Sequence, residues 1–447
     1  MKCMEWMTRR FLAAAALAFV ATFATAAGAA PNEQFFPLIG WRTGPLAALG
    51  VNVAAGWIDY MDLLNKRDGG INGVKLTWEE CETAYKVDRG VECYERLKKN
   101  GPTGASSFNP INTGVIYALL DRVAVDHIPL VTIGSGRTDA SDGRVFPWVF
   151  PLGTNYLSIN SVKIQFIGMQ EGGMDKLKGK KIVNIHMESA GGKETMPLLD
   201  AEAKKYGFEL TNVSVAMPGS DQEAAWLEIR KINPDWVILR EWGVAPAVAL
   251  KTAQKVGFPA NRIVAVTWAG TEDDLIPAGD AAKGVFVVHP FPTGADFPVT
   301  QEIKKYVYGG GNRGNLEDAS RMGLVFYNVG VTYGIINTEA VRVAQEKFGK
   351  RPLTGEEVRW GLEHLDLNEA RLKALGAWGL VQTIKSSCLD HEGGGAAKVY
   401  QWDGAKLVQV SDWIKADSSL TRPLIEESAA KYAAEKGITP RDCSKEN

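Results

Sequence analysis

Residues 187–194 of the sequence, MESAGGKE, have a spacing that could hold a phosphate. A phosphate-binding loop reads G-x-x-x-x-G-K-[ST], and Gly192 with Lys193 would supply its Gly-Lys pair. The loop then needs a glycine at position 187 and a hydroxyl at position 194, where the sequence has Met187 and Glu194. Because a glutamate would also repel the phosphate, the sequence excludes this nucleotide site.

A second glycine-containing stretch, GSGRTD at residues 134–139, resembles a dinucleotide-binding turn. The third glycine of that motif is replaced by Asp139, so the sequence does not predict a dinucleotide-binding site here. No G-x-S-x-G nucleophile turn and no H-E-x-x-H zinc motif is present. The histidines are scattered, at His127, His186, His289, His364 and His391. No nucleophile and base can be paired from the sequence, which favours binding over catalysis.

Acidic and sulfur ligands give no metal site either. Residues 272–274, EDD, are better explained as a solvated loop or helix start than as a carboxylate cluster. The cysteines lack C-x-x-C spacing, so zinc is not expected. We predict no cofactor.

The elements that must position a binding site alternate between apolar runs and amphipathic stretches. This rhythm is typical of parallel sheets covered by helices on both faces, an α/β fold class. Parallel sheets bind ligands beyond the carboxyl ends of their strands. The expected strands are residues 35–41, 73–81, 128–134, 180–187, 208–217, 235–241 and 262–268.

The length of 447 residues favours two lobes over a single core. Pro-, Gly- and aromatic-rich stretches at 145–156 and 285–298 interrupt the rhythm and are predicted to cross between lobes, with 376–383 as a third crossing. We therefore expect two doubly wound parallel-sheet lobes joined by three crossover segments. Lobe I comprises 30–154 and 288–378; lobe II comprises 155–287 and 379–447, ending in a hairpin and a helix.

The first 29 residues have the pattern of a cleavable signal peptide. Lys2, Arg9 and Arg10 precede an Ala-rich apolar run, and Ala27-Gly28-Ala29 is a small-residue cleavage site. The run is short for a membrane anchor, which is the alternative. The sequence leaves the general and the twin-arginine export routes open, and the periplasm is the expected location.

Cleavage would remove Cys3 and leave four cysteines, an even number that indicates two disulfides in an oxidising compartment. Three pairings are possible, and we expect the local one, Cys81 with Cys93 and Cys388 with Cys443. The formal net charge of −2 gives no reason to expect a nucleic-acid partner.

Several blocks resemble the periplasmic branched-chain amino-acid-binding proteins of ABC importers. They are GPLAALG, NVAAGWIDYMDLLNKRDGGINGVKL, DRGVECYERLKKN, IPLVTIGSGRTD, PDWVILREWG, GDAAKGVFVVHPF and the YQWDG and VSDWI pieces. The resemblance implies a type I periplasmic binding protein fold, hinge closure on a small-molecule solute, and delivery to an ABC permease in the membrane. A monomer is expected.

The resemblance also implies which lobe I residues hold a ligand carboxylate. They lie at a helix start and in the loop after residues 128–134, namely Asn112, Thr113, Ser135, Gly136, Arg137 and Thr138. A helix start suits an anion because its N–H groups are unpaired. Arg137 replaces a small residue of the family, and either pairs with the ligand carboxylate or points to solvent.

On the second lobe the family supplies aromatic walls. The aromatic candidates here are Trp242 and Trp268, with Trp41 and Tyr156 at the first strand end and the first crossing. Further candidate contacts are Ser189, Ala190 and Gly191 in the loop after residues 180–187, and Glu241 at the end of residues 235–241. Near relatives carry Tyr where this chain has Gly191, which predicts a roomier pocket at that point.

The ligand is less closely defined than the protein class. The family often places a glutamate for the ligand ammonium near residues 269–271, but here Glu272 is out of register and Glu241 is the possible substitute. An amino acid, an aromatic or carboxylate compound, or an amide therefore all stay open. The sequence predicts a substrate-binding protein and no enzyme; the alternatives are an exported ligand sensor and an enzyme on the same fold.

Overall fold

A computed structural model describes residues 32–44 and 46–445. The predicted signal peptide lies outside the described residues. Within the described part of the chain, no helix is long and apolar enough to cross a membrane.

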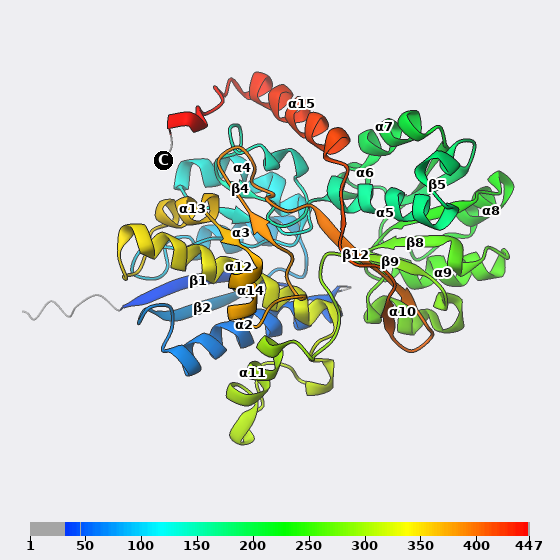
Figure 1. Cartoon of the computed structure of the whole chain (residues 1–447). Coiled ribbons are helices and arrows are strands. Elements are labelled where there is room, and N and C mark those ends of the chain that lie inside the picture. The colour runs from blue at the N-terminus through cyan, green and yellow to red at the C-terminus, as the bar shows by residue number, and fades with distance from the viewer. Residues whose placement is uncertain (1–31, 45, 446–447) are drawn as a thin grey trace, which may run out of the picture. The chain divides into compact units, whose positions relative to one another are not determined.

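Parallel strands form the first lobe (Figure 1). Strand β1 (Glu33–Gly40) pairs in parallel with β2 (Lys75–Glu82), and β3 (Leu130–Val131) with β4 (Val149–Phe150). Residues 106–108 connect these pairs, because the Ser106 N–H donates to the Phe35 carbonyl oxygen and the Val131 N–H to that of Phe108. The helices of this lobe are α2 (Ala47–Asp68), α3 (Val87–Leu97), α4 (Thr113–Asp126), α11 (Pro298–Tyr306), α12 (Val325–Phe348), α13 (Gly355–Glu363) and α14 (Glu369–Ala374).

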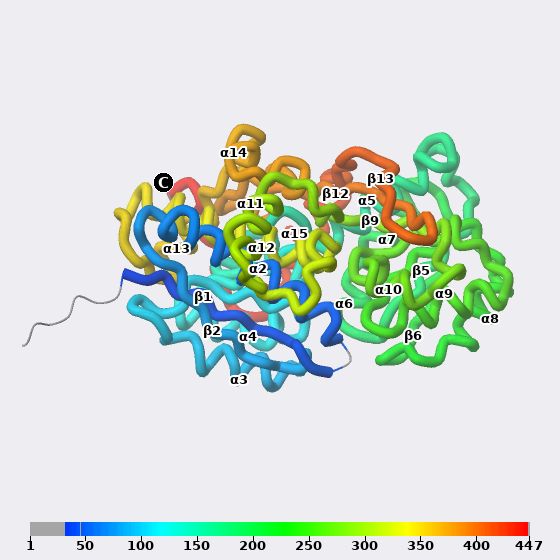
Figure 2. Tube along the Cα trace, turned by 90° about the horizontal axis from the view of Figure 1, so that it is seen from below, coloured from blue at the N-terminus to red at the C-terminus, as the bar shows by residue number. Residues whose placement is uncertain are grey.

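Two glycines let α2 and α12 pack closely. A Cβ added at Gly56 would lie 2.1 Å from the carbonyl oxygen of Tyr327, and one added at Gly330 would lie 2.0 Å from that of Val53. Any side chain at either position would therefore push the helices apart. Both helices lie together in the views of Figures 1 and 2.

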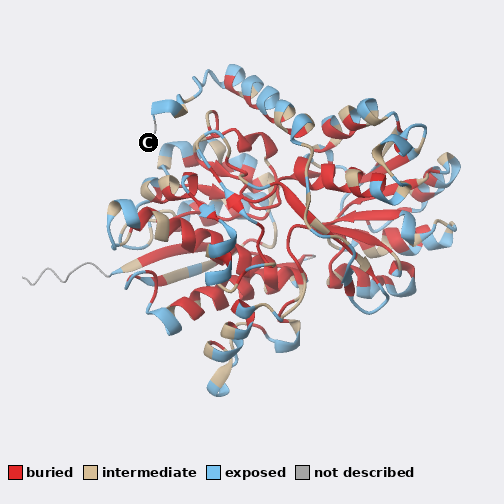
Figure 3. Cartoon of the chain, viewed as in Figure 1, coloured by how far each residue is buried: buried red, intermediate tan, exposed pale blue. Residues whose placement is uncertain are grey.

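The second lobe contains a larger sheet with the order β13-β12-β9-β8-β7-β5-β6. Its strands β5 (Lys181–Met187), β6 (Glu209–Val215), β7 (Trp236–Arg240), β8 (Ile263–Val266) and β9 (Phe286–His289) are parallel. This confirms the expected α/β class. The helices are α5 (Tyr156–Glu171), α6 (Ala190–Lys193), α7 (Met196–Tyr206), α8 (Glu223–Ile232), α9 (Ala245–Lys255) and α10 (Glu272–Ala278). Figure 3 shows the central strands of this sheet as buried and the outer helix faces as exposed.

A hairpin follows the last part of lobe I. Strand β12 (Ala396–Trp402) pairs antiparallel with β13 (Leu407–Gln409), β14 (Ile414–Lys415) and β9, and Asp403 begins the turn. The short pair β10 (Asp366–Leu367) and β11 (Ile384–Lys385) precedes it.

The first predicted crossing, 145–156, is hydrogen-bonded to residues 392–395, which follow the third predicted crossing, 376–383. The Gly153 N–H donates to the Glu392 carbonyl oxygen at 2.7 Å, and the Gly395 N–H donates to that of Gly153 at 2.6 Å. A further crossing follows β9. We retain the lobe limits expected from the sequence as a proposal.

The C-terminal segment, residues 417–445, contacts both lobes. It contains α15 (Ser418–Lys436), which passes along the top of Figure 1. At its start, Asp417 accepts hydrogen bonds from Lys205 and Tyr206 of α7. Near its end, Tyr432 stacks on Phe146 of lobe I, with ring centroids 4.8 Å apart.

The structure contains two disulfides. They join Cys81 to Cys93 and Cys388 to Cys443, each pair with Cα atoms 5.7 Å apart. The second disulfide joins the end of the C-terminal segment to the stretch between β11 and β12.

Candidate functional site

A cavity of about 290 Å³, here called the main cavity, opens where the strands of both lobes end. Its walls come from loops after β1, β2, β3, β5, β6, β7 and β8 and from the starts of α4, α5 and α12. This is where a parallel sheet is expected to bind a ligand. The predicted site residues that line it are Trp41, Asn112, Thr113, Ser135, Tyr156, Ser189, Ala190, Gly191, Trp242 and Trp268.

Lobe I contributes the start of α4. The side-chain oxygen of Asn112 accepts hydrogen bonds from the N–H groups of Gly114 and Val115, at 2.9 and 3.3 Å. Its amide donates to the Tyr85 carbonyl oxygen at 2.9 Å. The Asn112 side chain therefore caps the helix and fixes the neighbouring loop. The Thr113 hydroxyl, one residue further, lies 3.3 Å from the Tyr156 hydroxyl.

Lobe II contributes the short helix α6, where Ser189 accepts a hydrogen bond from the Gly192 N–H at 3.1 Å. Buried Arg240 holds this loop from behind. Its Nε and Nη2 donate to the Gly191 carbonyl oxygen at 3.0 and 2.6 Å, and its guanidinium lies 4.2 Å from the Tyr156 ring centroid.

Gly191 has close neighbours from three other loops. A Cβ at this position would lie 3.3 Å from the Thr113 hydroxyl oxygen and 3.7 Å from both Trp242 and Tyr156. Gly191 therefore lies in close contact with its neighbours and also lines the cavity, and the roomier pocket stays a prediction.

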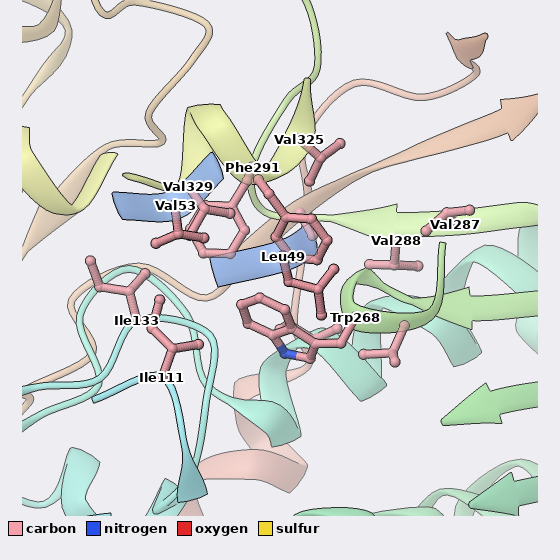
Figure 4. Close-up of a cluster of buried hydrophobic side chains, with 14 of the residues drawn as sticks. Leu49, Val53, Ile111, Ile133, Trp268, Val287, Val288, Phe291, Val325 and Val329 are labelled. Atoms are coloured by element: carbon pink, nitrogen blue, oxygen red, sulfur yellow. The ribbon is translucent and has the colours of Figure 1, made fainter. Parts of the chain in front are cut away.

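Aromatic rings form most of the remaining wall. Trp268 is stacked with Phe326, with centroids 6.0 Å apart, and Trp41 meets Tyr85 edge-on at 5.6 Å. Figure 4 shows the buried apolar side chains that surround Trp268, including Leu49. These contacts hold the rings in fixed orientations.

The three cavity tryptophans differ in their hydrogen bonding. The Trp268 indole N–H donates to the Gly134 carbonyl oxygen at 3.0 Å. The indole nitrogens of Trp41 and Trp242 are buried and have no hydrogen-bond partner among the described residues. They are donors that a ligand could satisfy.

Arg137 does not line the main cavity and adopts neither of the two expected arrangements. Its guanidinium makes a paired contact with the Asp139 carboxylate, at 2.6 and 2.7 Å, and lies 4.2 Å from the Tyr432 ring centroid of α15. The side chain faces a second cavity of about 340 Å³ beneath α15. Pairing and stacking within the protein account for its buried charge.

Thr138 and Gly136 also lie outside the main cavity. The Thr138 N–H donates to a Glu194 carboxylate oxygen at 2.6 Å, and the Thr138 hydroxyl donates to the same oxygen. A Cβ at Gly136 would lie 2.5 Å from the other Glu194 oxygen. This loop therefore joins the two lobes at the edge of the cavity.

Glu241 is buried inside lobe II and does not line the cavity. Its carboxylate accepts a hydrogen bond from the Gln222 amide at 3.0 Å, and burial raises the pKa of Glu241 to about 8. Successive residues at a strand end point to opposite faces, and Arg240 takes the face toward the cavity.

Sequence reasoning missed other lining residues, namely Leu46, Leu49, Tyr85, Val87, Ile111, Gly114, Met217 and Phe326. Tyr85 follows the expected strand 73–81, and Met217 ends the expected strand 208–217. The rule that ligands bind at the carboxyl ends of parallel strands could therefore have found both residues. Phe326 follows no strand and gave no signal. Within the described chain, no group of His, Cys, Asp and Glu side chains is arranged to hold a metal ion.

Comparison with known proteins gives a family for this architecture. Residues 33–406 match a family model described as periplasmic binding protein. A crystal structure from the Pseudomonas fluorescens group, described as an ABC transporter permease, is 50% identical, with a TM-score of 0.89, and the match covers 92% of this chain and 100% of that one. A search among curated proteins found no match.

More distant structures share the fold. A branched-chain amino acid ABC transporter protein from Thermus thermophilus with bound valine is 20% identical, with a TM-score of 0.73, covering 88% of this chain and 99% of that one. A solute-binding protein from R. palustris in complex with benzoate is 16% identical, with a TM-score of 0.64, covering 86% and 98%. The matched span and the two-lobed architecture together show that the chain belongs to the periplasmic binding protein family, with the type I fold.

Proposed function

We propose that this protein is the extracytoplasmic substrate-binding protein of an ABC importer. It captures a small organic solute between its two lobes and delivers it to a membrane permease. The observation that carries the proposal is the main cavity, whose aromatic walls come from the strand ends of both lobes. Family membership supports the same function.

The lining of the cavity supports binding rather than catalysis. Its side-chain hydroxyls include those of Ser135 and Ser189, and among the described residues no histidine lies in the lining. A serine nucleophile needs a base within hydrogen-bond reach. We therefore propose a protein that binds its solute unchanged, exported by the signal sequence at residues 1–29 and working as a monomer.

Thermal unfolding with a panel of amino acids, aromatic acids and amides tests the proposal. A ligand that binds only the folded state stabilises it by about 2.7 kcal/mol at 100 times its Kd, so a true ligand should raise Tm. No rise with any panel member would contradict a solute-binding role.

The variant Trp242→Ala ties the effect to this cavity. We expect it to weaken binding of the stabilising ligand while the protein stays folded, because Trp242 is only partly buried and lines the cavity. Exposed Trp378 provides the control: Trp378→Ala should leave binding unchanged. Equal loss of binding in both variants would show that the ligand does not bind in the main cavity.

A further inference from the structure

The main cavity has no charged wall. Among the described residues that line it there is no Asp, Glu, Lys, Arg or His. An α-amino acid would bring an ammonium group into this space together with its carboxylate. A buried charge needs a partner, and an unpaired one is strongly disfavoured.

Three buried carboxylates lie outside the cavity lining. One oxygen of Glu194 accepts two hydrogen bonds from Thr138, and the other, close to Gly136, has no hydrogen-bond partner among the described residues. Glu272 accepts hydrogen bonds from the Thr293 hydroxyl at 2.6 Å and from the Val325 N–H at 3.1 Å. Glu241 is held by Gln222 inside lobe II. None of these carboxylates lines the cavity, so none is placed to receive a ligand ammonium.

Two side chains of the cavity lining carry unpaired hydrogen-bond donors. The indole N–H groups of Trp41 and Trp242 have no acceptor among the described residues. The side-chain oxygens of Asn112 and Ser189 already accept backbone N–H groups. A ligand that offers oxygen acceptors would satisfy the two indoles, whereas a ligand that offers donors would leave them unpaired.

A buried positive charge lies directly behind the wall. Arg240 is 1% exposed, makes no ion pair within the described chain, and leaves its Nη1 without a partner there. Its guanidinium lies 4.2 Å from the ring centroid of Tyr156, a residue that lines the cavity. Because buried charges interact strongly at low effective dielectric, this site favours an anionic ligand.

From these observations we infer that the main cavity selects a flat aromatic monocarboxylate that carries no ammonium group. The indole N–H groups of Trp41 and Trp242 are its specificity-determining donors. This inference rests on the proposed function, and it goes further by naming the class of solute.

The test compares two ligands that differ in the ammonium alone. Isothermal titration of the mature protein with 3-phenylpropanoate and with phenylalanine should give a Kd at least about tenfold lower for 3-phenylpropanoate, because each 1.4 kcal/mol is tenfold in affinity. Benzoate and benzamide form a second pair, in which the carboxylate should bind more tightly.

The outcomes separate the two proposals. Tighter binding of phenylalanine, or of the uncharged benzamide, would overturn the inference and leave the substrate-binding function intact. Binding of none of these four, with a Tm rise for an aliphatic or other solute in the wider panel, would also overturn only the inference. No rise in Tm with any compound of the panel would contradict the substrate-binding function itself.

The variant Trp242→Phe removes the donor and keeps an aromatic wall. We expect its Kd for the aromatic carboxylate to rise about tenfold with Tm unchanged, since a hydrogen bond to a charged group is lost. Trp378→Phe is the matched control, because Trp378 is 42% exposed and lies outside the cavity lining. An unchanged Kd in Trp242→Phe would remove Trp242 from the specificity determinants.

Discussion

Adjacent residues at the end of β7 carry opposite charges, and lobe II buries both of them. Arg240 turns toward Gly191 and Tyr156, and Glu241 turns toward Gln222. Neither forms an ion pair with the other among the described contacts, because neighbouring strand residues point to opposite faces. Arg240 is attracted to the Glu194 carboxylate, and Glu241 is hydrogen-bonded to the neutral Gln222 amide.

Burial of Glu241 makes a prediction about pH. Its pKa is raised from 4.5 to about 8, so the folded state holds a proton that the unfolded state releases between these values. This group therefore stabilises the fold fully below pH 4.5, and that contribution is lost as pH rises toward 8.

The variant Glu241→Gln removes this titration. Its free energy of unfolding, relative to the natural protein, should increase between pH 5 and pH 8 by about 1.4 kcal/mol per pH unit at most. Urea unfolding across this range provides the measurement. Parallel pH curves for the two proteins would show that Glu241 does not titrate there.

Residue placement was predictable where a side chain directly follows a parallel strand. Trp242 and Trp268 were found in this way. Arg137 could not be placed, because its position depends on Asp139 and on Tyr432, which comes from a helix almost 300 positions away in the chain. A charged strand-end residue gives no sign of which face it will take.

At the scale of elements, the N-terminus of α4 is capped by Asn112 and also forms part of the cavity wall. Asn112 satisfies two N–H groups of the helix and ties it to the Tyr85 carbonyl oxygen. The variant Asn112→Ala should therefore destabilise the protein by about 1 kcal/mol and also weaken ligand binding, since Thr113 loses its fixed position.

Asn368 allows the two effects to be separated. It caps α14 through a hydrogen bond from the Arg371 N–H at 3.0 Å, and it does not line the main cavity. Asn368→Ala should lower the unfolding free energy by a similar amount and leave Kd unchanged. Equal Kd values in the two variants would show that the α4 cap has no role in binding.

Elements were predicted more reliably than side chains. Residues 180–187 and 235–241 were expected as buried strands, and β5 and β7 occupy them as neighbours in a parallel sheet. Apolar runs bounded by glycine and charged residues carry this information locally. The contribution of α12 to the cavity, through Phe326, depends on packing against α2, so no local sequence pattern predicts it.

At the scale of the whole molecule, contacts between the lobes lie around the cavity. Trp268 of lobe II donates to the Gly134 carbonyl oxygen of lobe I, and Glu194 accepts from Thr138. Asp273 accepts from Arg321 in the same way. The structure therefore has the arrangement in which both lobes contact each other over the cavity, as hinge closure requires.

The variant Thr138→Val tests whether these contacts support binding. It removes the hydroxyl that donates to Glu194 and retains the backbone N–H. Because a ligand bound between closed lobes is held more weakly when the closed state is less populated, we expect Kd to rise about tenfold.

A threonine within one lobe is the control. The Thr252 hydroxyl donates to the Val248 carbonyl oxygen inside α9, so Thr252→Val should leave Kd unchanged. A lower Tm with unchanged Kd in Thr138→Val would give the contact a role in stability alone. Such contacts could not be read from the sequence, because Thr138 and Glu194 meet only through the positions of two separately folded lobes.

The contacts that residues 417–445 make with both lobes can form only after those lobes have folded. Asp417 attaches to α7, Tyr432 to Phe146, and Cys443 to Cys388, so this segment connects both lobes. A nascent chain can form its two sheets before these residues emerge, but it cannot form this final connection. The Cys388–Cys443 disulfide then needs an oxidant, so reduction of the protein should release residues 417–445 from one of their three attachments.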